Sequence, residues 1–171
     1  MDERIVARIL VVDDSPEIID LVRLTLEDIG CEGMGATSGE RALEPVQRQL
    51  PELILLDVVM PGIDGFETCR RLKQDERTQA ISVIFLTGLN DVEHLAAGFA
   101  AGGADYITKP FRKEEVLLRV EMHLERARLA QALVEQNAAL QQEIAQRQQL
   151  SRRVSQLSEQ EDQRWGLADF V

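Results

Sequence analysis

Hydrophobic residues in the first two thirds of the chain form short continuous runs that are separated by amphipathic stretches. Three strong runs cover residues 8–12, 53–56 and 81–86, and two weaker runs cover 31–36 and 105–108. The strong runs contain no polar alternation, which predicts strands that are buried on both faces of a sheet. Five such strands alternating with helices predict an α/β fold with a doubly wound parallel sheet.

Four amphipathic stretches between these runs predict helices. Pro16 follows Ser15, and proline at the first helical position after a capping serine predicts a helix start. Apolar residues continue at helical spacing through Ile29, and Gly30 predicts the end of this helix. Further helices are expected over residues 38–49, 65–75 and 91–101.

A different pattern begins at Lys113 and continues to about Glu161. This stretch contains no proline or glycine and is rich in Gln, Glu, Arg, Leu and Ala, which predicts one long helix. Its first turns, with Val116 and Val120, are expected to pack on the sheet. We expect residues 125–171 to form a separate helical linker and tail that pairs weakly as a coiled coil in a homodimer.

The register of that coiled coil is ambiguous from the sequence. Two seams of residues spaced three and four apart compete. One contains Leu133, Leu140, Leu150, Val154 and Leu157, and the other contains Leu133, Asn137, Leu140, Ile144 and Val154.

Charge and composition narrow the classes of function. The net charge is −11, and residues 1–111 hold 10 Lys/Arg against 20 Asp/Glu, so no basic stripe is available to a phosphate backbone. We therefore expect no direct nucleic-acid binding. No apolar run approaches the roughly 20 residues of a membrane span, and the N-terminus lacks a secretory signal, which favours a cytoplasmic protein without membrane contact. Cys31 and Cys69 match no metal-binding spacing and are expected to be reduced.

Polar side chains stand at the carboxyl ends of four predicted strands. Asp13 and Asp14 follow the first, Asp57 the third, Thr87 the fourth and Lys109 the fifth. Singly, such residues are usually turn formers or helix caps. A parallel sheet, however, brings all these strand ends to one edge, where ligands bind in such folds.

Three carboxylates at one edge repel each other unless positive charge compensates them. A divalent cation together with Lys109 balances the charges of Asp13, Asp14 and Asp57. The candidate ligands are hard oxygens, with no His or Cys nearby in sequence, so Mg²⁺ fits and Zn²⁺ does not.

This set of side chains suits phosphoryl transfer, in which catalysis is mostly positioning and charge neutralisation. Asp57 is the candidate nucleophile, which would form an acyl phosphate. Lys109 would place a compact positive charge on one phosphoryl oxygen, and the Thr87 hydroxyl could donate a hydrogen bond to another.

The segments VVDDSP, LILLDVVMPGIDGF, IFLTG and GADYITKPF, in this order and spacing, resemble the receiver domain of bacterial two-component response regulators. The resemblance covers about residues 6–124 and places a domain boundary near residue 124, with the receiver at 1–124. It implies a flavodoxin-like sheet with strand order 2-1-3-4-5. It also implies phosphorylation by a histidine kinase or a phosphotransfer protein.

The resemblance assigns a role to each matching residue. It makes Asp57 the phosphoacceptor and Asp13/Asp14 the acidic pair that binds Mg²⁺. The backbone carbonyl of Val59 becomes a further metal ligand. Thr87 and Tyr106 match the switch pair. Lys109 matches the phosphate-contacting lysine, and its peptide bond to Pro110 is expected to be cis.

Two departures from the family pattern affect the expected kinetics. Gly88 follows Thr87 where alanine is common, which loosens that loop. Val59 and Leu89 are apolar at positions that influence phosphoryl lifetime, and they offer no group to orient a hydrolytic water. We therefore expect slow autodephosphorylation.

The main hypothesis is a receiver that relays its phosphorylation state through the C-terminal helix. His94 and His123 lack the sequence surroundings of a kinase phosphoacceptor and are expected to be surface or partly packed residues. One alternative is the regulatory part of a larger enzyme, such as a diguanylate cyclase, a hybrid kinase or an AAA+ transcriptional activator, although no motif of these occurs in this chain. A constitutive coiled-coil scaffold is the other alternative.

Overall fold

The computed structural model describes residues 6–44, 48–88 and 92–166. The chain divides into two compact units, Met1–Ala127 and Arg128–Val171.

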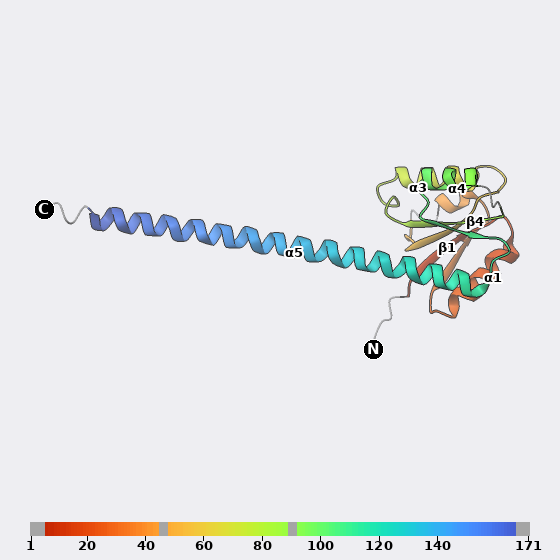
Figure 1. Ribbon diagram of the computed structural model, residues 1–171, viewed down its shortest axis with the longest axis horizontal. Coiled ribbons are helices and arrows are strands. Elements are labelled where there is room, and N and C mark those ends of the chain that lie inside the picture. The colour runs from red at the N-terminus through yellow and green to blue at the C-terminus, as the bar shows by residue number, and fades with distance from the viewer. Residues whose placement is uncertain (1–5, 45–47, 89–91, 167–171) are drawn as a thin grey trace. The chain divides into compact units, whose positions relative to one another are not determined.

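The first unit is built around a five-stranded parallel sheet with strand order β2-β1-β3-β4-β5 (Figure 1). The strands are β1 (Arg8–Val12), β2 (Glu32–Ala36), β3 (Leu53–Asp57), β4 (Ser82–Thr87) and β5 (Asp105–Thr108). This order confirms the doubly wound, flavodoxin-like prediction. The strand pairing aligns Asp57 with Leu86 and Thr87 with Thr108, so the carboxyl ends of these strands lie at the same edge.

The helices are α1 (Pro16–Glu27), α2 (Gly39–Leu43), α3 (Gly65–Gln74), α4 (Val92–Ala100) and α5 (Lys113–Gly166). They cover two separate apolar cores, one on each face of the sheet. Ile9 and Val11 face the core shared with α1 and with the first turns of α5, whereas Leu10 and Val12 face the core shared with α2 and α3. Successive residues of β1 are thus buried on opposite faces, as the unbroken apolar run predicted.

The helix expected over residues 38–49 is the clearest error of the sequence analysis. The observed α2 ends at Leu43, residues 48–50 are not helical, and residues 45–47 lie outside the described residues. Pro45 explains the early end, because proline disfavours the helical conformation of the residue before it and lacks a backbone N–H.

Smaller differences concern helix ends. Ser15 occupies the N-cap position of α1, but its hydroxyl donates to Glu17 and makes no capping bond to the backbone. The helix ends at Glu27, two residues before Ile29, and Gly30 then adopts a positive φ of 71°. The expected start of α4 at Asp91 lies outside the described residues.

Helix α5 begins at the predicted Lys113 and extends to Gly166, which is longer than expected. Val116, Val120, His123 and Leu124 are buried, as the expected packing of its first turns requires. All side chains from residue 125 to residue 166 are exposed. Cys31 and Cys69 are both buried and are not joined in a disulfide.

Among the described residues, no helix is both long and apolar enough to cross a membrane. The expected cytoplasmic location stays a prediction.

Candidate functional site

The predicted acidic residues come together at the carboxyl edge of the sheet. Asp13 follows β1, Asp57 ends β3, and both are buried, with 1% and 5% of their surface exposed. Asp14 is exposed at the rim. One carboxylate oxygen from each of Asp13, Asp14 and Asp57 lies within 4.8 Å of the others. The sequence-predicted cluster therefore exists as a compact set of oxygen ligands.

Lys109 brings the positive charge into this cluster. Its Nζ lies 2.7 Å from Asp13 Oδ2 and 3.3 Å from Asp57 Oδ1. The lysine follows β5, and its backbone N–H donates to the carbonyl of Thr87 at 2.7 Å. The Lys109–Pro110 peptide bond is cis, which confirms the sequence expectation. The ammonium group thus bridges the two buried acids.

The ion pairs only partly compensate the cost of burying these charges. Burial, with the nearby charge of Asp13, raises the pKa of Asp57 from 3.8 to about 6, although Lys109 and the backbone N–H of Val59 oppose this rise. Burial alone would lower the pKa of Lys109. The hydrogen bond to Asp13 and the charges of Asp57 and Asp13 outweigh burial, so the pKa of Lys109 is raised. The cluster keeps an excess of negative charge after Lys109 has been counted.

A divalent cation fits this excess. Three carboxylates and one ammonium leave two negative charges on closely spaced oxygens, and the cluster contains no nitrogen or sulfur ligand. This donor set matches Mg²⁺, which prefers one or two carboxylates and keeps further positions for water and phosphate oxygens. The Val59 side chain is exposed, and its predicted role as a carbonyl ligand stays a prediction.

The segment after Asp57 is held in place by contacts that the sequence analysis missed. Gly65 begins α3 against the backbone of β3, and its N–H donates to the carbonyl of Val58 at 2.8 Å. A Cβ at Gly65 would lie 2.2 Å from the carbonyl oxygen of Asp57. Only glycine therefore lets α3 start so close to the candidate acceptor. The motif PGIDGF contained this signal, because a glycine directly after a capping residue indicates close backbone packing.

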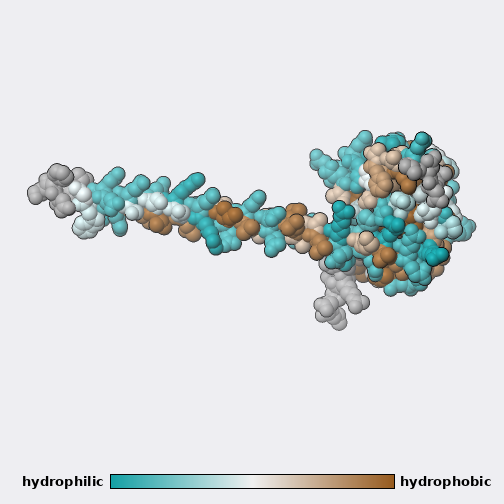
Figure 2. Space-filling model, in the orientation of Figure 1, coloured by the Kyte–Doolittle hydropathy of each residue, from teal (hydrophilic) through white to brown (hydrophobic). Residues whose placement is uncertain are grey.

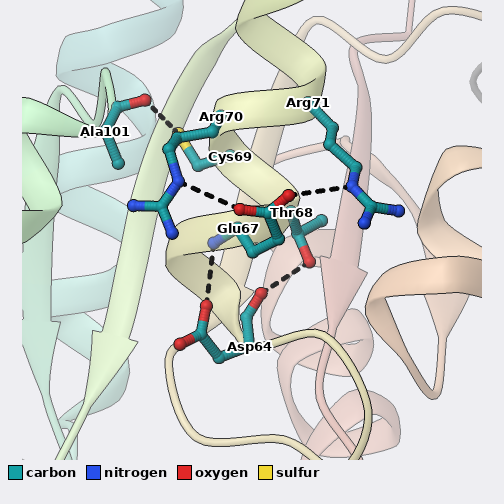
Figure 3. Close-up of polar contacts among 7 residues, drawn as sticks. All are labelled: Asp64, Glu67, Thr68, Cys69, Arg70, Arg71 and Ala101. Carbon is teal, nitrogen blue, oxygen red and sulfur yellow. Dashed lines mark hydrogen bonds and ion pairs between the residues drawn. The ribbon is translucent and has the colours of Figure 1, made fainter.

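Side chains of α3 fix its orientation, as Figure 3 shows. Asp64 caps the helix by accepting from the backbone N–H of Glu67 at 2.8 Å, and the Thr68 hydroxyl donates to the carbonyl of Asp64 at 2.7 Å. The Cys69 thiol donates to the carbonyl of Ala101, which ties α3 to the end of α4. The loop that follows Asp57 thus lies between two fixed elements.

Thr87 and Tyr106, the predicted switch pair, line one apolar cavity beside the acid cluster. Val58, Phe66, Phe85 and several residues of α4 complete its wall. Thr87 is 4% exposed, whereas Tyr106 is half-buried with its ring edge-to-face against Phe99, at a centroid distance of 6.4 Å. The two residues therefore line the same cavity. Their role as a switch pair stays a prediction.

A polar network on β5 and α5 was also missed by the sequence analysis. Asp105 accepts from Arg119 Nη1 at 2.7 Å, and its other oxygen lies 3.0 Å from His123 Nε2. Burial opposes ionisation of Asp105, but the bonds from His123 and Arg119 hold its pKa below the ordinary value. The Arg119 guanidinium also lies 5.9 Å from the centroid of the Tyr106 ring. His123 is thus a packed histidine, as expected, whereas His94 is exposed and contributes to the cavity wall.

The raised pKa of Asp57 predicts how stability depends on pH without metal. The folded state binds a proton at Asp57 more tightly than the unfolded state does, because the pKa of Asp57 is raised on folding from 3.8 to about 6. This tighter proton binding stabilises the folded protein at low pH, and the stabilisation is lost as the pH rises from about 4 through about 6. Asp57→Asn should remove this loss and raise the free energy of unfolding at pH 7.5 by about 2 kcal/mol. Urea unfolding curves of both proteins, recorded at several pH values with a metal chelator present, measure this difference in the free energy of unfolding.

Asp20→Asn is the matched control, because Asp20 is an exposed aspartate on α1. It should change the free energy of unfolding by less than about 0.5 kcal/mol at every pH. An Asp57→Asn variant that is less stable than the parent protein at pH 7.5 would contradict the electrostatic account.

The contact at Gly65 predicts a large effect of one added methyl group. Gly65→Ala should lower the free energy of unfolding by about 2–4 kcal/mol, because its Cβ collides with backbone that cannot move aside. Gly88→Ala is the control, since a Cβ there meets no atom of the described residues within 4 Å. It should be neutral or slightly stabilising. Equal denaturation midpoints for the two variants would refute the proposed close approach.

Comparison with known proteins agrees with this geometry. The family described as "Response regulator receiver domain" matches residues 9–121. The chain is 44% identical over 126 residues to the DNA-binding dual master transcriptional regulator RpaA of Synechocystis, covering 73% of this chain and 52% of that protein. It is 41% identical over 114 residues to the response regulator PleD of Caulobacter vibrioides, covering 67% of this chain and 25% of PleD.

Solved structures give the same result. The chemotaxis response regulator CheY4 of Vibrio cholerae superimposes with a TM-score of 0.66 at 31% identity, covering 69% of this chain and 98% of that one. NtrX of Brucella abortus superimposes with a TM-score of 0.71 at 30% identity, covering 77% of this chain and 29% of NtrX. The chain spans about half the length of RpaA. With the family match covering residues 9–121, the chain belongs to the response regulator receiver domain family.

Proposed function

We propose that this chain is a Mg²⁺-dependent phosphoacceptor that receives a phosphoryl group on Asp57 from a histidine kinase or a phosphotransfer protein. The observation that carries the proposal is the placement of Asp57. It is a buried carboxylate, 3.3 Å from Lys109 Nζ and within 4.8 Å of the acidic oxygens of Asp13 and Asp14. A buried cluster with uncompensated negative charge is costly to maintain in a structural role alone.

The transfer step follows from these positions. A carboxylate oxygen of Asp57 attacks the phosphorus of a phosphohistidine, and a P–O bond forms as the P–N bond breaks. The bonding electron pair leaves with the imidazole nitrogen, which is protonated from solvent, and an acyl phosphate remains on Asp57. The raised pKa of Asp57, about 6, leaves the carboxylate mainly ionised at neutral pH.

Several groups of this chain neutralise charge during the step. Lys109 already contacts Asp57 and can place its ammonium group against a phosphoryl oxygen. Asp13 and Asp14 would hold the cation. Bound Mg²⁺ supplies positive charge to the phosphoryl oxygens of the loose transition state.

The Thr87–Tyr106 cavity supports a role in passing on the phosphorylation state. A phosphoryl group on Asp57 adds charge and acceptor oxygens next to the end of β4. A hydrogen bond from the Thr87 hydroxyl to that group would draw Thr87 toward Asp57 and leave room in the cavity for the Tyr106 ring. This movement would shift the population of surface arrangements around α4 and β5.

The output is carried by α5 in this proposal. The exposed apolar side chains of its second part support pairing with another copy of the chain, which would relay the signal to further segments or partners. The size of the relatives supports a second candidate, namely that this receiver regulates a larger protein. PleD extends far beyond the matched region, and RpaA is described as DNA-binding. Our expectation that this chain makes no direct contact with nucleic acid stays a prediction.

Phosphoryl labelling tests the acceptor directly. The protein should incorporate one phosphoryl group per chain from a labelled small-molecule phosphoryl donor, such as acetyl phosphate, when Mg²⁺ is present. The label should be lost in hydroxylamine, because an acyl phosphate reacts with that nucleophile. Asp57→Asn should reduce incorporation by at least about 100-fold, since an amide cannot replace the nucleophile.

Two comparisons make the labelling test specific. Asp64→Asn, at an exposed aspartate that caps α3, should keep its label. Lys109→Ala should fold but show impaired labelling, because the phosphoryl oxygens lose their fixed cation. Retained hydroxylamine-sensitive label in Asp57→Asn would move the acceptor to another residue.

A further inference from the structure

The second part of α5 carries an exposed stripe of aliphatic side chains. Figure 2 shows brown apolar patches along this helix between teal polar regions. The members of the stripe are between 47% and 65% exposed. They are Leu133, Leu140, Ile144, Leu150, Val154 and Leu157. Six aliphatic side chains at such exposure need a partner, because isolated helices gain no stability from an apolar face in water.

The spacing of these residues resolves the two competing seams. Leu133, Leu140 and Ile144 fit one heptad frame, in which Asn137 lies between the leucines. Leu150, Val154 and Leu157 fit a second frame. Ten residues separate Leu140 from Leu150, and ten also separate Ile144 from Val154, where a continuous heptad pattern would have seven. The two frames therefore follow one another along the helix, joined by a single three-residue insertion that rotates the second seam relative to the first.

The types of residue assign the core positions consistently on both sides of the insertion. The leucines take the d positions, and the β-branched Ile144 and Val154 take the a positions. β-Branched residues at a with leucine at d favour parallel two-stranded coiled coils. Neither unbroken frame places Ile144 and Leu150 in the core together, so the interrupted pattern accounts for more of the stripe.

Asn137 identifies the partner. It occupies an a position, where a single buried asparagine fixes register and favours a dimer. In a parallel, in-register pair its amide meets the same amide of the second copy, and each can donate and accept a hydrogen bond. An antiparallel pair would place Asn137 opposite aliphatic side chains and leave its amide unsatisfied.

We propose that residues 133–157 of α5 pair in parallel and in register with the same residues of a second copy of this chain, with one break in the heptad pattern at Arg147. This inference rests on the dimerising helix of the proposed function and specifies its partner, orientation and register. The occupant is a second copy because the six aliphatic layers and the Asn137 layer are self-complementary.

Charges beside the stripe are compatible with this pairing. In the parallel arrangement the flanking contacts join Gln136 to Gln141 and Arg153 to Ser158 of the second copy, so no like charges meet at these flanking positions. Arg147 falls in the extra layer between Ile144 and Leu150. In register it faces Arg147 of the second copy, which makes this the least favourable layer of the pair. Its guanidinium bonds Glu143 of its own helix at 2.8 Å, which reduces the repulsion.

The break has a structural consequence. The insertion adds three residues, whereas one turn of a coiled-coil helix contains about 3.5. The second frame is therefore rotated by about 50° about the helix axis relative to the first. The pair must overwind locally near Arg147 to keep both frames in contact. This stretch is therefore the part of the pair most able to take up a rotation of one frame against the other.

Cysteine cross-linking in the full chain tests the register. Single variants Glu143→Cys, Ile144→Cys, Leu150→Cys and Ser151→Cys are oxidised, and the fraction of covalent dimer is measured. The interrupted pattern predicts cross-linking at 144 and 150 at least tenfold faster than at 143 and 151. The parent chain is the background control, because Cys31 and Cys69 are buried.

Each alternative gives a different pattern. Fast cross-linking at 144 and 151 would show an unbroken first frame, and fast cross-linking at 143 and 150 an unbroken second frame. Either result would overturn the break at Arg147. A chain that sediments as a monomer and cross-links at no position would overturn the pairing itself. Labelling of Asp57 is measured separately and would survive that result.

A deletion provides an independent test. Removing residues 147–149 makes the heptad pattern continuous, so the dimer should become at least tenfold tighter in sedimentation analysis. Removing residues 134–136, an equal number, interrupts the first frame and should weaken the dimer by at least tenfold. Arg147→Ala separates loss of the arginine from the change in spacing and should have a smaller effect than the 147–149 deletion. Weakening of the dimer by the 147–149 deletion would refute the proposal.

Discussion

The close approach of Asp13, Asp57 and Lys109 is the constraint on which the site depends. Two nearly buried carboxylates share one ammonium group, whose Nζ lies 2.7 Å from one and 3.3 Å from the other. A buried charge without a partner is costly, so the two ion pairs lower the free-energy cost of keeping both carboxylates in the cluster. One ammonium cannot balance three acids, however. The remaining negative charge is the basis of our proposal that this edge of the sheet binds a cation and, through the cation, a phosphoryl group.

Backbone packing in the fold positions the other residues of the candidate site. The parallel strands end together and bring residues far apart in the sequence to one edge. Gly65 lets α3 begin against the backbone of Asp57, which fixes the position of the proposed acceptor. On the other side, Thr87 connects the acid cluster to the cavity that Tyr106 lines. Thr87 therefore lies between Asp57, where a charge change is proposed, and the cavity that the Tyr106 ring lines.

Sequence patterns predicted those features that depend on local residue order. Unbroken apolar runs predicted the strands, and their polar ends predicted the acid cluster and Lys109. The length of α2 was wrong because Pro45 was overlooked. The contacts of Asp105 with Arg119 and His123 could not be predicted, because they join β5 to α5 through tertiary packing. The roles of the site residues in phosphorylation remain predictions, since geometry places them together without showing a reaction.

Calorimetric titration with Mg²⁺ near pH 6, in two buffers with different ionisation enthalpies, tests the central electrostatic claim most directly. Because the pKa of Asp57 is about 6, cation binding should displace a proton from the partly protonated cluster. The account predicts one Mg²⁺ per chain with net proton release, and loss of that release in Asp57→Asn. Absence of saturable binding, or identical binding and proton release in the parent chain and Asp57→Asn, would contradict it.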